Sequence, residues 1–427
     1  MQSMGIRMQT NRRLFLSTLG VCAASGLVGC GGGSSETPPV YEAKPIGTWM
    51  GVLSDLQEDL RFLDIPPPFS SSFQDQTLRQ VAHLSLGADQ LRIQFGNLYG
   101  KAPLPLARVR AALSTGGGTV DKATDVAVTF QGADSVSIPA GGEVWSDIVS
   151  LQVPDGGNVA VSVYVKETAD STTAHRFANA TQYVASGDLT SASAMPSSPA
   201  NQLAASYWMS AIDVYRKSSA RVVVAFGDSL TEGKGSTTDA NQRYPDLLSS
   251  RLQKAGGSAS VSVVNAGLGG NRWLHDRLGL NGVERFRRDV LGVSGVTHAI
   301  LQLGINDIGF QLDWTPNERA TAKELIASMS QAVAAAKSRG IHVFLATLTP
   351  FKGYVYFSDS GEKMRQEVNA WIRANTEASG VFDFDAAVRD PADPSRIFAP
   401  YRDADHLHLN DLGYLRLAES VDLDKFR

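Results

Sequence analysis

The segment that decides the fold runs from Val222 to Leu230 and reads VVVAFGDSL. Its first five residues are apolar, three of them valine, and they predict a buried strand; Gly227 and Asp228 mark the turn that ends it. Four more apolar runs follow, and they cover 261–265, 298–303, 343–347 and 381–384. The amphipathic stretches between these runs predict crossover helices over 244–255, 283–291, 318–339 and 361–379, with Asn410 placed to cap a last helix from Asp411. Strands that alternate with helices predict a three-layer α/β/α domain of flavodoxin-like strand order, which we place at 216–427.

Polar clusters stand where the predicted strands end. They comprise Gly227 to Leu230 after the first strand, Gly267 to Asn271 after the second, Gly304 to Asp307 after the third, and Asp405 to His408 beyond the fifth. In an open parallel sheet, ligands bind outside the carboxyl ends of the strands. We therefore expect these distant residues to meet in one crevice.

The residue types in these clusters suit acyl transfer. Ser229, at a strand-to-helix turn, is the candidate nucleophile, His408 the base that takes its proton, and Asp405 the group that holds the imidazole. The candidate oxyanion donors are the backbone N–H groups of Ser229 and Gly270 and the side chain of Asn306. This chemistry requires no cofactor.

Alternatives stay open at some of these positions. Gly267 or Gly269 could replace Gly270 as the donor, and Asp228 and Asp307 are interpreted as capping or turn residues. Trp273, three residues beyond Gly270, is a candidate for the substrate pocket. Other aromatic residues that could line it, but fit ordinary packing better, are Trp208, Tyr354, Tyr356 and Phe357.

The acidic and histidine-rich stretch near the end offers two registers. Asp403 with His406 has the same spacing as Asp405 with His408. We prefer His408, because only that histidine is followed by the pattern of Asn410, Gly413 and Tyr414. Two histidines beside carboxylates could also bind zinc, but the remaining histidines show no ligand spacing, so we expect no metal.

The four blocks together resemble the SGNH hydrolase family, also called GDSL hydrolases, across roughly Arg221 to Arg427. The resemblance implies that Ser229, Gly270, Asn306 and His408 are the four positions that name the family, with Asp405 as the partner of the histidine. Leu409 stands where proline is common in the family's last block.

The preceding region, 45–215, has strand character. Leu91, Ile93 and Phe95 alternate with polar residues, and short β-rich runs separated by glycine pairs follow them. This pattern predicts a β-sandwich or jelly-roll domain. The region also resembles a bacterial subgroup of the family with a β-domain before the catalytic one, including arylesterases linked to plant cell-wall breakdown. A carbohydrate-binding or substrate-shaping role and a purely structural role are equally open for it.

The first 29 residues predict an export signal. Arg12 and Arg13 precede a mildly apolar run, a layout that resembles a twin-arginine signal. The run ends at Cys30 in a sequence that resembles a bacterial lipobox, so we expect cleavage before Cys30 and a lipid on its thiol. Gly31 in place of aspartate favours the outer membrane. The alternative is a simple secretory signal that contains a cysteine.

The two cysteines agree with this interpretation. Cys22 lies within the predicted signal and Cys30 would be acylated, so the mature chain would have no free thiol and no disulfide. The Gly, Ser and Pro residues of 30–44 predict a flexible tether.

Composition limits the class of protein. With 427 residues, 43% hydrophobic and 19% charged, the chain can bury ordinary cores. Its net charge of -4 does not provide the basic surface that nucleic-acid binding requires, so we do not expect a nucleic-acid partner. We expect a serine carboxylic-ester hydrolase for short acyl esters, including acetyl groups of polysaccharides. The alternatives are a lipase or thioesterase for longer chains, and an inactive glycan-binding surface lipoprotein.

Overall fold

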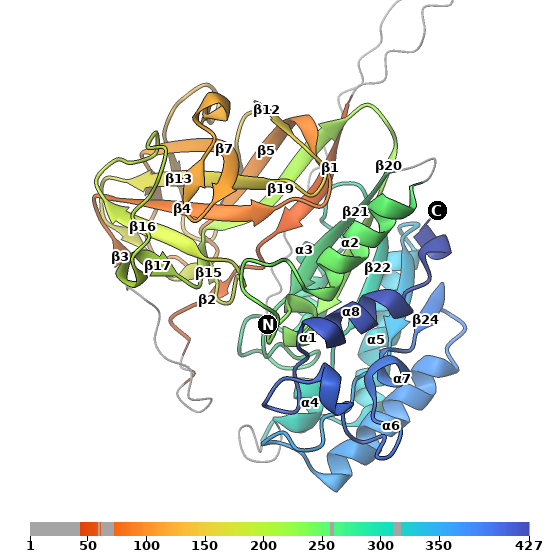
Figure 1. Ribbon diagram of the computed structural model, residues 1–427. Helices are drawn as coiled ribbons and strands as arrows, with labels where there is room; N and C mark the ends of the chain where they lie inside the picture. The colour runs from red at the N-terminus through yellow and green to blue at the C-terminus, as the bar shows by residue number, and fades with distance from the viewer. Residues whose placement is uncertain (1–42, 59, 61–71, 257–259, 311–316, 427) are drawn as a thin grey trace, which may run out of the picture. The chain divides into compact units, whose positions relative to one another are not determined.

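The computed structural model describes residues 43–58, 60, 72–256, 260–310 and 317–426 (Figure 1). The chain from Glu42 to Arg427 forms one compact unit. The predicted export signal, Cys30 and most of the predicted tether lie outside the described residues. No helix among the described residues combines the length and the apolar character needed to cross a membrane.

The second half of the chain contains a parallel sheet of five strands in the order β21-β20-β22-β23-β24. In chain order this is 2-1-3-4-5, the flavodoxin-like order predicted from the sequence. The strands are β20 (Ala220–Gly227), β21 (Ser260–Gly267), β22 (Val296–Gln302), β23 (His342–Ala346) and β24 (Gly380–Phe382). Gly227 pairs with Gly267 on one side and with Gln302 on the other, so the first three strands end at the same edge.

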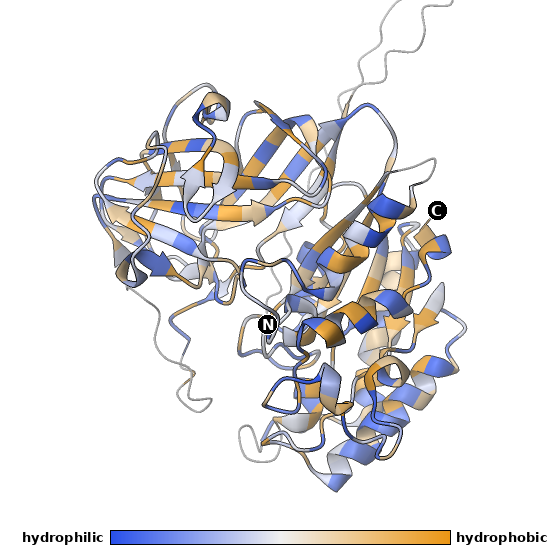
Figure 2. Cartoon of the chain, viewed as in Figure 1, coloured by the Kyte–Doolittle hydropathy of each residue, from blue (hydrophilic) through white to orange (hydrophobic). Residues whose placement is uncertain are grey.

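Helices complete the three layers. Helix α2 packs against β21 and α8, whereas α3, α5 and α6 form a second contacting group; with the usual right-handed crossovers, the two groups cover opposite faces of the sheet. Blue and orange alternate along these helices in Figure 2, because each buries an apolar stripe against the sheet. The α-helices are α1 (Ser229–Glu232), α2 (Tyr244–Ala255), α3 (Gly282–Asp289), α4 (Ile305–Gly309), α5 (Ala322–Lys337), α6 (Asp359–Arg373), α7 (Phe384–Val388) and α8 (Asp411–Ser420).

Two helix limits differ from the prediction for local reasons. Helix α5 begins at Ala322, not at 318, because Thr321 and Glu324 form a reciprocal capping box there. Helix α6 ends at Arg373, not at 379, and the Asn375 side chain then accepts the N–H groups of the next turn. The predicted cap of α8 is confirmed, since Asn410 Oδ1 accepts the Gly413 N–H at 3.0 Å.

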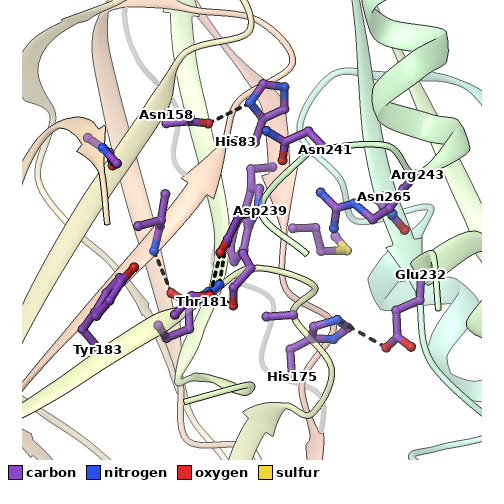
Figure 3. Close-up of a pocket in the computed structure, with 18 of the residues that line it drawn as sticks. His83, Asn158, His175, Thr181, Tyr183, Glu232, Asp239, Asn241, Arg243 and Asn265 are labelled. Atoms are coloured by element: carbon purple, nitrogen blue, oxygen red, sulfur yellow. Dashed lines mark hydrogen bonds and ion pairs between the residues drawn. The ribbon is translucent and has the colours of Figure 1, made fainter. Parts of the chain in front are cut away.

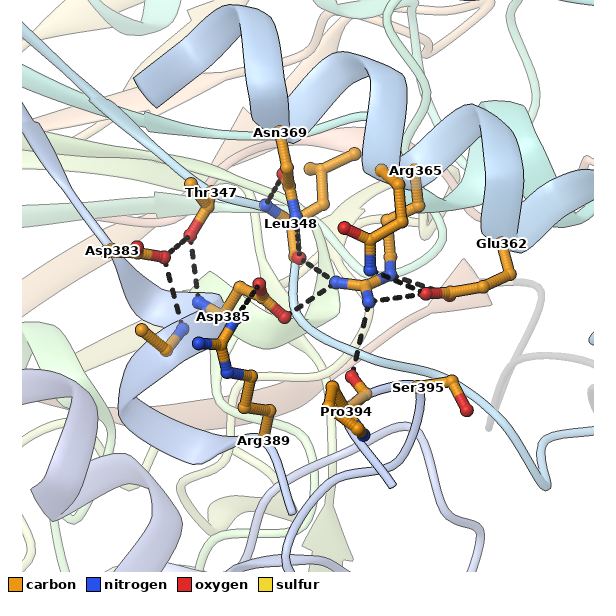
Figure 4. Close-up of polar contacts among 12 residues, drawn as sticks. Thr347, Leu348, Glu362, Arg365, Asn369, Asp383, Asp385, Arg389, Pro394 and Ser395 are labelled. Atoms are coloured by element: carbon orange, nitrogen blue, oxygen red, sulfur yellow. Dashed lines mark hydrogen bonds and ion pairs between the residues drawn. The ribbon is translucent and has the colours of Figure 1, made fainter. Parts of the chain in front are cut away.

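A buried arginine network holds the end of β23 (Figure 4). Arg365 of α6 is fully buried and donates at 2.8 Å both to the Leu348 carbonyl and to the Asp385 carboxylate. Asn369 also binds Leu348, with its Nδ2 group 2.8 Å from the same carbonyl. These contacts fix the start of the loop that carries Tyr354 toward the site.

The first half is strand-rich and antiparallel. Leu91, Ile93 and Phe95 in β5 are all fully buried, as their alternation predicts. The coarse prediction of a β-rich region is confirmed, whereas the jelly-roll connectivity and the domain limits stay predictions. One sheet contains β1 (Lys44–Met50), β19 (Met209–Arg216), β5 (Ala88–Gly96), β11 (Glu143–Trp145) and β12 (Val149–Val153).

A second sheet has seven strands, β17 (Gln202–Leu203), β16 (Gln182–Ser186), β4 (Gln76–His83), β13 (Asn158–Val165), β7 (Arg108–Gly116), β8 (Thr119–Val120) and β9 (Val126–Val128). Short strands form smaller ladders, namely β2 (Ser54–Asp55), β15 (Thr173–His175), β18 (Ser206–Tyr207), β3 (Ser72–Phe73), β14 (Ala169–Asp170), β6 (Leu104–Leu106) and β10 (Val136–Ile138). The 3-10 helices are η2 (Lys122–Thr124), η3 (Pro199–Asn201), η4 (Ala399–Tyr401) and η5 (Leu423–Phe426).

Buried polar contacts join the strand-rich region to the parallel sheet. Ser262 of β21 is fully buried and donates to the Gly47 carbonyl of β1 at 2.7 Å. Ser85 lies 2.6 Å from the Ser262 hydroxyl, and the Gly47 N–H donates to the Ser294 carbonyl at 2.9 Å. Because buried hydroxyl and backbone groups need partners, these bonds specify how the two regions pack.

Candidate active site

Ser229 lies where β20 ends and α1 begins. The predicted role of Asp228 as a cap is confirmed, since its carboxylate accepts the Leu230 N–H at 3.0 Å. Ser229 is the first residue of the helix, so its backbone N–H has no acceptor within α1 and can face a ligand. The side chain is buried but borders a pocket.

The structure brings Ser229, His408 and Asp405 together. Ser229 Oγ is 2.7 Å from His408 Nε2, although the two residues are 179 positions apart. On the other side of the ring, His408 Nδ1 is 2.5 Å from Asp405 Oδ2. A carboxylate only accepts, so Nδ1 carries the ring proton and Nε2 is left to accept the proton of the serine.

The second register does not reach the serine. Asp403 Oδ1 accepts the Ala404 N–H at 2.7 Å, and the His406 N–H donates to the Asp403 carbonyl. The His406 ring instead lies against the loop at Gly353, where an added Cβ would be 2.7 Å from its Nδ1. The contacts therefore agree with the choice of His408.

The charges of the pair suit a base. Burial, the largest effect, lowers the pKa of His408, and the hydrogen bond to Asp405 offsets this only in part, so the imidazole is neutral near pH 7. Burial alone would raise the pKa of Asp405. Hydrogen bonds from the His408 ring and from two backbone N–H groups outweigh it, and they hold that pKa well below its usual range.

Gly270 and Asn306 border the same pocket as Ser229. Gly270 has a φ of 73°, and an added Cβ would be 2.0 Å from Leu278, so only glycine fits there. Asn306 Nδ2 donates to the Asn271 carbonyl at 3.0 Å, and Oδ1 accepts from the Tyr356 hydroxyl at 3.2 Å. An amide nitrogen carries two hydrogens, which leaves one for a ligand.

Asp307 holds the glycine loop in place. Its carboxylate accepts the backbone N–H groups of Trp273 at 2.7 Å and Leu274 at 3.0 Å. Burial raises the pKa of Asp307 to about 6, and the two backbone bonds counteract that rise. The interpretation of Asp307 as a structural residue agrees with these contacts.

The structure does not place Trp273 at the pocket. Its side chain is fully buried, its Nε1 donates to the Leu303 carbonyl at 2.9 Å, and its ring packs against Phe226. The predicted substrate contact is therefore corrected to a core role, because the tight turn after Gly270 directs the indole inward. Of the other aromatic residues, Tyr354 lines the pocket, with its ring in edge contact with His408.

Residues that the sequence analysis did not name complete the pocket, which holds about 580 Å³ of empty space open to solvent. They include Leu278, Phe310 and Lys234, and also Phe177 from the strand-rich region. Lys234 and Leu278 follow the serine and glycine blocks closely in sequence, so proximity could have suggested them. Nothing in its local sequence marks Phe177, because the motifs all lie after residue 220.

A larger pocket lies on the other side of Glu232 (Figure 3). It is lined by residues of both regions, among them His83, Thr181 and Arg243, and it contains neither Ser229 nor His408. Glu232 borders both pockets, and burial raises its pKa to about 8. Among the described residues, no three His, Cys, Asp or Glu side chains form a group that could hold a metal ion.

Comparison with known proteins agrees with this geometry. The GDSL-like Lipase/Acylhydrolase family model matches residues 225–416, which make up most of the α/β part of the chain. The protein is accordingly an ester-hydrolysing enzyme. A search of curated proteins by sequence gave no match.

Three solved structures illustrate the similarity. A lipolytic G-D-S-L family protein from Desulfitobacterium hafniense is 21% identical over 47% of this chain and 96% of its own, with a TM-score of 0.36. A carbohydrate acetylesterase from Sinorhizobium meliloti is 20% identical over 48% and 97%, with a TM-score of 0.37. The aryl esterase of M. smegmatis is 18% identical over 47% and 96%, with a TM-score of 0.38.

Proposed function

We propose that this enzyme hydrolyses short acyl esters through an acyl-serine intermediate on Ser229. The observation that carries the proposal is the continuous chain of contacts from Ser229 Oγ to His408 Nε2, at 2.7 Å, and from His408 Nδ1 to Asp405, at 2.5 Å. A serine activated by a neutral imidazole that a carboxylate orients is a general device for acyl transfer.

The first half of the reaction forms the acyl-enzyme. Ser229 Oγ attacks the carbonyl carbon of the ester while its proton moves to His408 Nε2. The oxyanion then accepts hydrogen bonds from the backbone N–H groups of Ser229 and Gly270 and from Asn306 Nδ2. When the C–O bond to the alcohol breaks, His408 gives its proton to the departing oxygen.

The second half releases the acid. A water molecule gives one proton to His408 Nε2, and its oxygen attacks the acyl carbon. When the bond to Ser229 Oγ breaks, the proton returns to that oxygen, so both serine and histidine regain their starting states. Asp405 stays ionised throughout and stabilises the transient imidazolium.

The test uses residues 31–427 with p-nitrophenyl acetate and the variants Ser229→Ala and His408→Ala. We expect both variants to lose at least about 1,000-fold in kcat, with circular dichroism unchanged. A fluorophosphonate should label Ser229 alone, as read by mass spectrometry of peptides. Full turnover in Ser229→Ala would refute the proposal.

We further propose that the natural acyl group is acetyl on a polysaccharide. An open pocket lined by a few apolar side chains supports a small acyl group with a large alcohol part outside it. Activity on p-nitrophenyl esters should fall steadily from two to eight acyl carbons, and acetate should be released from acetylated xylan. A maximum at eight carbons would instead indicate a lipase or thioesterase, and xylan binding without acetate release would indicate the inactive glycan-binding alternative.

We also propose that the enzyme is exported and tethered to the outer membrane by a lipid on Cys30. The twin arginines, the lipobox-like sequence and the Gly/Ser/Pro tether support this proposal. In a bacterial host, the full chain should incorporate labelled palmitate and sediment with outer membranes, whereas Cys30→Ser should not. Equal labelling of both forms would exclude this anchor.

A further inference from the structure

Phe177 reaches the active-site pocket from the strand-rich region. It lines the same pocket as Ser229 and His408, with 37% of the residue exposed. Its ring also lies against the glycine loop, since a Cβ added at Gly269 would be 3.2 Å from Phe177 Cδ2. The ring is thus beside the predicted oxyanion donor Gly270 and is partly exposed at the pocket.

The backbone before Phe177 is anchored to the nucleophile helix. His175 is 7% exposed, and its Nδ1 is 2.9 Å from the Val52 carbonyl. Its Nε2 is 3.4 Å from Glu232 Oε1 at the end of α1 (Figure 3). Because a carbonyl only accepts, Nδ1 carries the proton, and Nε2 faces the Glu232 carboxyl group.

The backbone after Phe177 is anchored to the same turn. Asn179 Nδ2 donates to the Gly233 carbonyl at 2.6 Å and to Ser236 Oγ at 2.9 Å. Asn179 also has a φ of 51°, a left-handed conformation that asparagine tolerates better than most residues. With the chain held two residues away on either side, the position of Phe177 is set before a substrate arrives, which reduces the entropy lost on binding.

We propose that Phe177 is an aromatic platform on which a ring in the alcohol part of the ester packs. The inference rests on the proposed function, because a short acyl group leaves the alcohol part to carry any ring. A phenylalanine face offers no hydrogen bond and binds flat, apolar surfaces, such as one face of a pyranose or of an aryl group. The strand-rich region would thereby contribute to substrate selection.

The test compares three acetate esters that share the acyl group: p-nitrophenyl acetate, acetylated xylotriose and ethyl acetate. Phe177→Ala should lower kcat/KM roughly 10-fold for the two ring-bearing esters, about the effect of one lost aromatic contact. The loss should appear mainly in KM, and ethyl acetate should change less than about 2-fold. Phe177→Tyr should restore the wild-type ratio between ring-bearing and alkyl esters.

Ile148→Ala is the matched control, because Ile148 is also an exposed hydrophobic residue of the strand-rich region, at 52%, and does not line the pocket. It should leave all three substrates unaffected. Equal losses on all three esters in Phe177→Ala, or no loss on any of them, would refute the proposed role of Phe177. Failure of the proposed function would appear differently, as ethyl acetate hydrolysis that persists in Ser229→Ala whatever stands at position 177.

Discussion

The two regions of this protein contribute to one site in different ways. The parallel sheet supplies every group that would exchange a proton or bind the oxyanion, and each stands directly after a strand or in the last loop before α8. The strand-rich region supplies Phe177, held through His175 and Asn179, and none of these would react. Chemistry is thus tied to the edge of a parallel sheet, whereas shape is contributed by whatever packs against that edge.

The largest effect should come from the carboxylate behind the base. Asp405→Asn should lower kcat by on the order of 1,000- to 10,000-fold, because the amide no longer holds the imidazole in the required tautomer. Asp403→Asn, two residues away, should lose less than about 3-fold, measured with p-nitrophenyl acetate at pH 7. A larger loss in the Asp403 variant would mean that Asp403 and His406, and not Asp405 and His408, act in the site.

A smaller loss should follow removal of one oxyanion donor. Asn306→Ala should lower kcat by about 100- to 1,000-fold and leave KM nearly unchanged, because the donor acts on charge that develops in the transition state. Tyr356→Phe removes the hydroxyl that donates to Asn306 Oδ1 and should cost less than about 10-fold in kcat. Equal losses in the two variants would mean that Asn306 acts by holding the loop and not by donating to the substrate.

The contact between the regions should affect stability in a pH-dependent way. Burial raises the pKa of Glu232 from 4.5 to about 8, so the folded state binds more protons than the unfolded state between these values. The contribution of the protonated Glu232 side chain to the free energy of unfolding is therefore fully present below pH 4.5 and is lost as the pH rises through 8.

Glu232→Gln cannot ionise, so its free energy of unfolding should not show this loss. Between pH 5 and 9 the wild type should lose on the order of 4 kcal/mol relative to the variant, measured by urea unfolding. Glu367→Gln, on an exposed side chain, should follow the wild type at every pH. Parallel curves for the wild type and Glu232→Gln would show that Glu232 is ionised in the folded protein and would weaken the described contact with His175.

The smallest effect concerns the acid side of the rate profile. Because burial lowers the pKa of His408 below its ordinary value of 6.5, the imidazole stays neutral in mildly acidic solution. The plateau of kcat/KM should therefore extend below pH 6.5, and activity should fall only at lower pH, as the base becomes protonated. A fall that begins above pH 6.5 would mean that Asp405 raises the pKa of His408 by more than burial lowers it.

The sequence by itself determined the parallel sheet, its five strands and the blocks at their ends. Apolar runs of strand length alternate with amphipathic stretches, and such periodicity depends on local residue order, as in Val222 to Leu230. It also indicated Ser229, Gly270, Asn306 and His408 as one set, because the carboxyl ends of parallel strands must share an edge.

Spacing alone could not choose between Asp405 and Asp403, since both lie three residues before a histidine. The residues that follow His408 favoured Asp405, and the tertiary structure agrees by placing His408 beside Ser229. Only the tertiary structure decided that Trp273 is a core residue, because the hydrogen bond from its indole to Leu303 depends on a strand 30 residues away. Phe177, His175 and Glu232 could not be connected beforehand, because they come from two regions that, within the described part of the chain, pair no strands with each other. Their meeting depends on how two surfaces pack, and packing is a property of the whole fold and not of a local pattern.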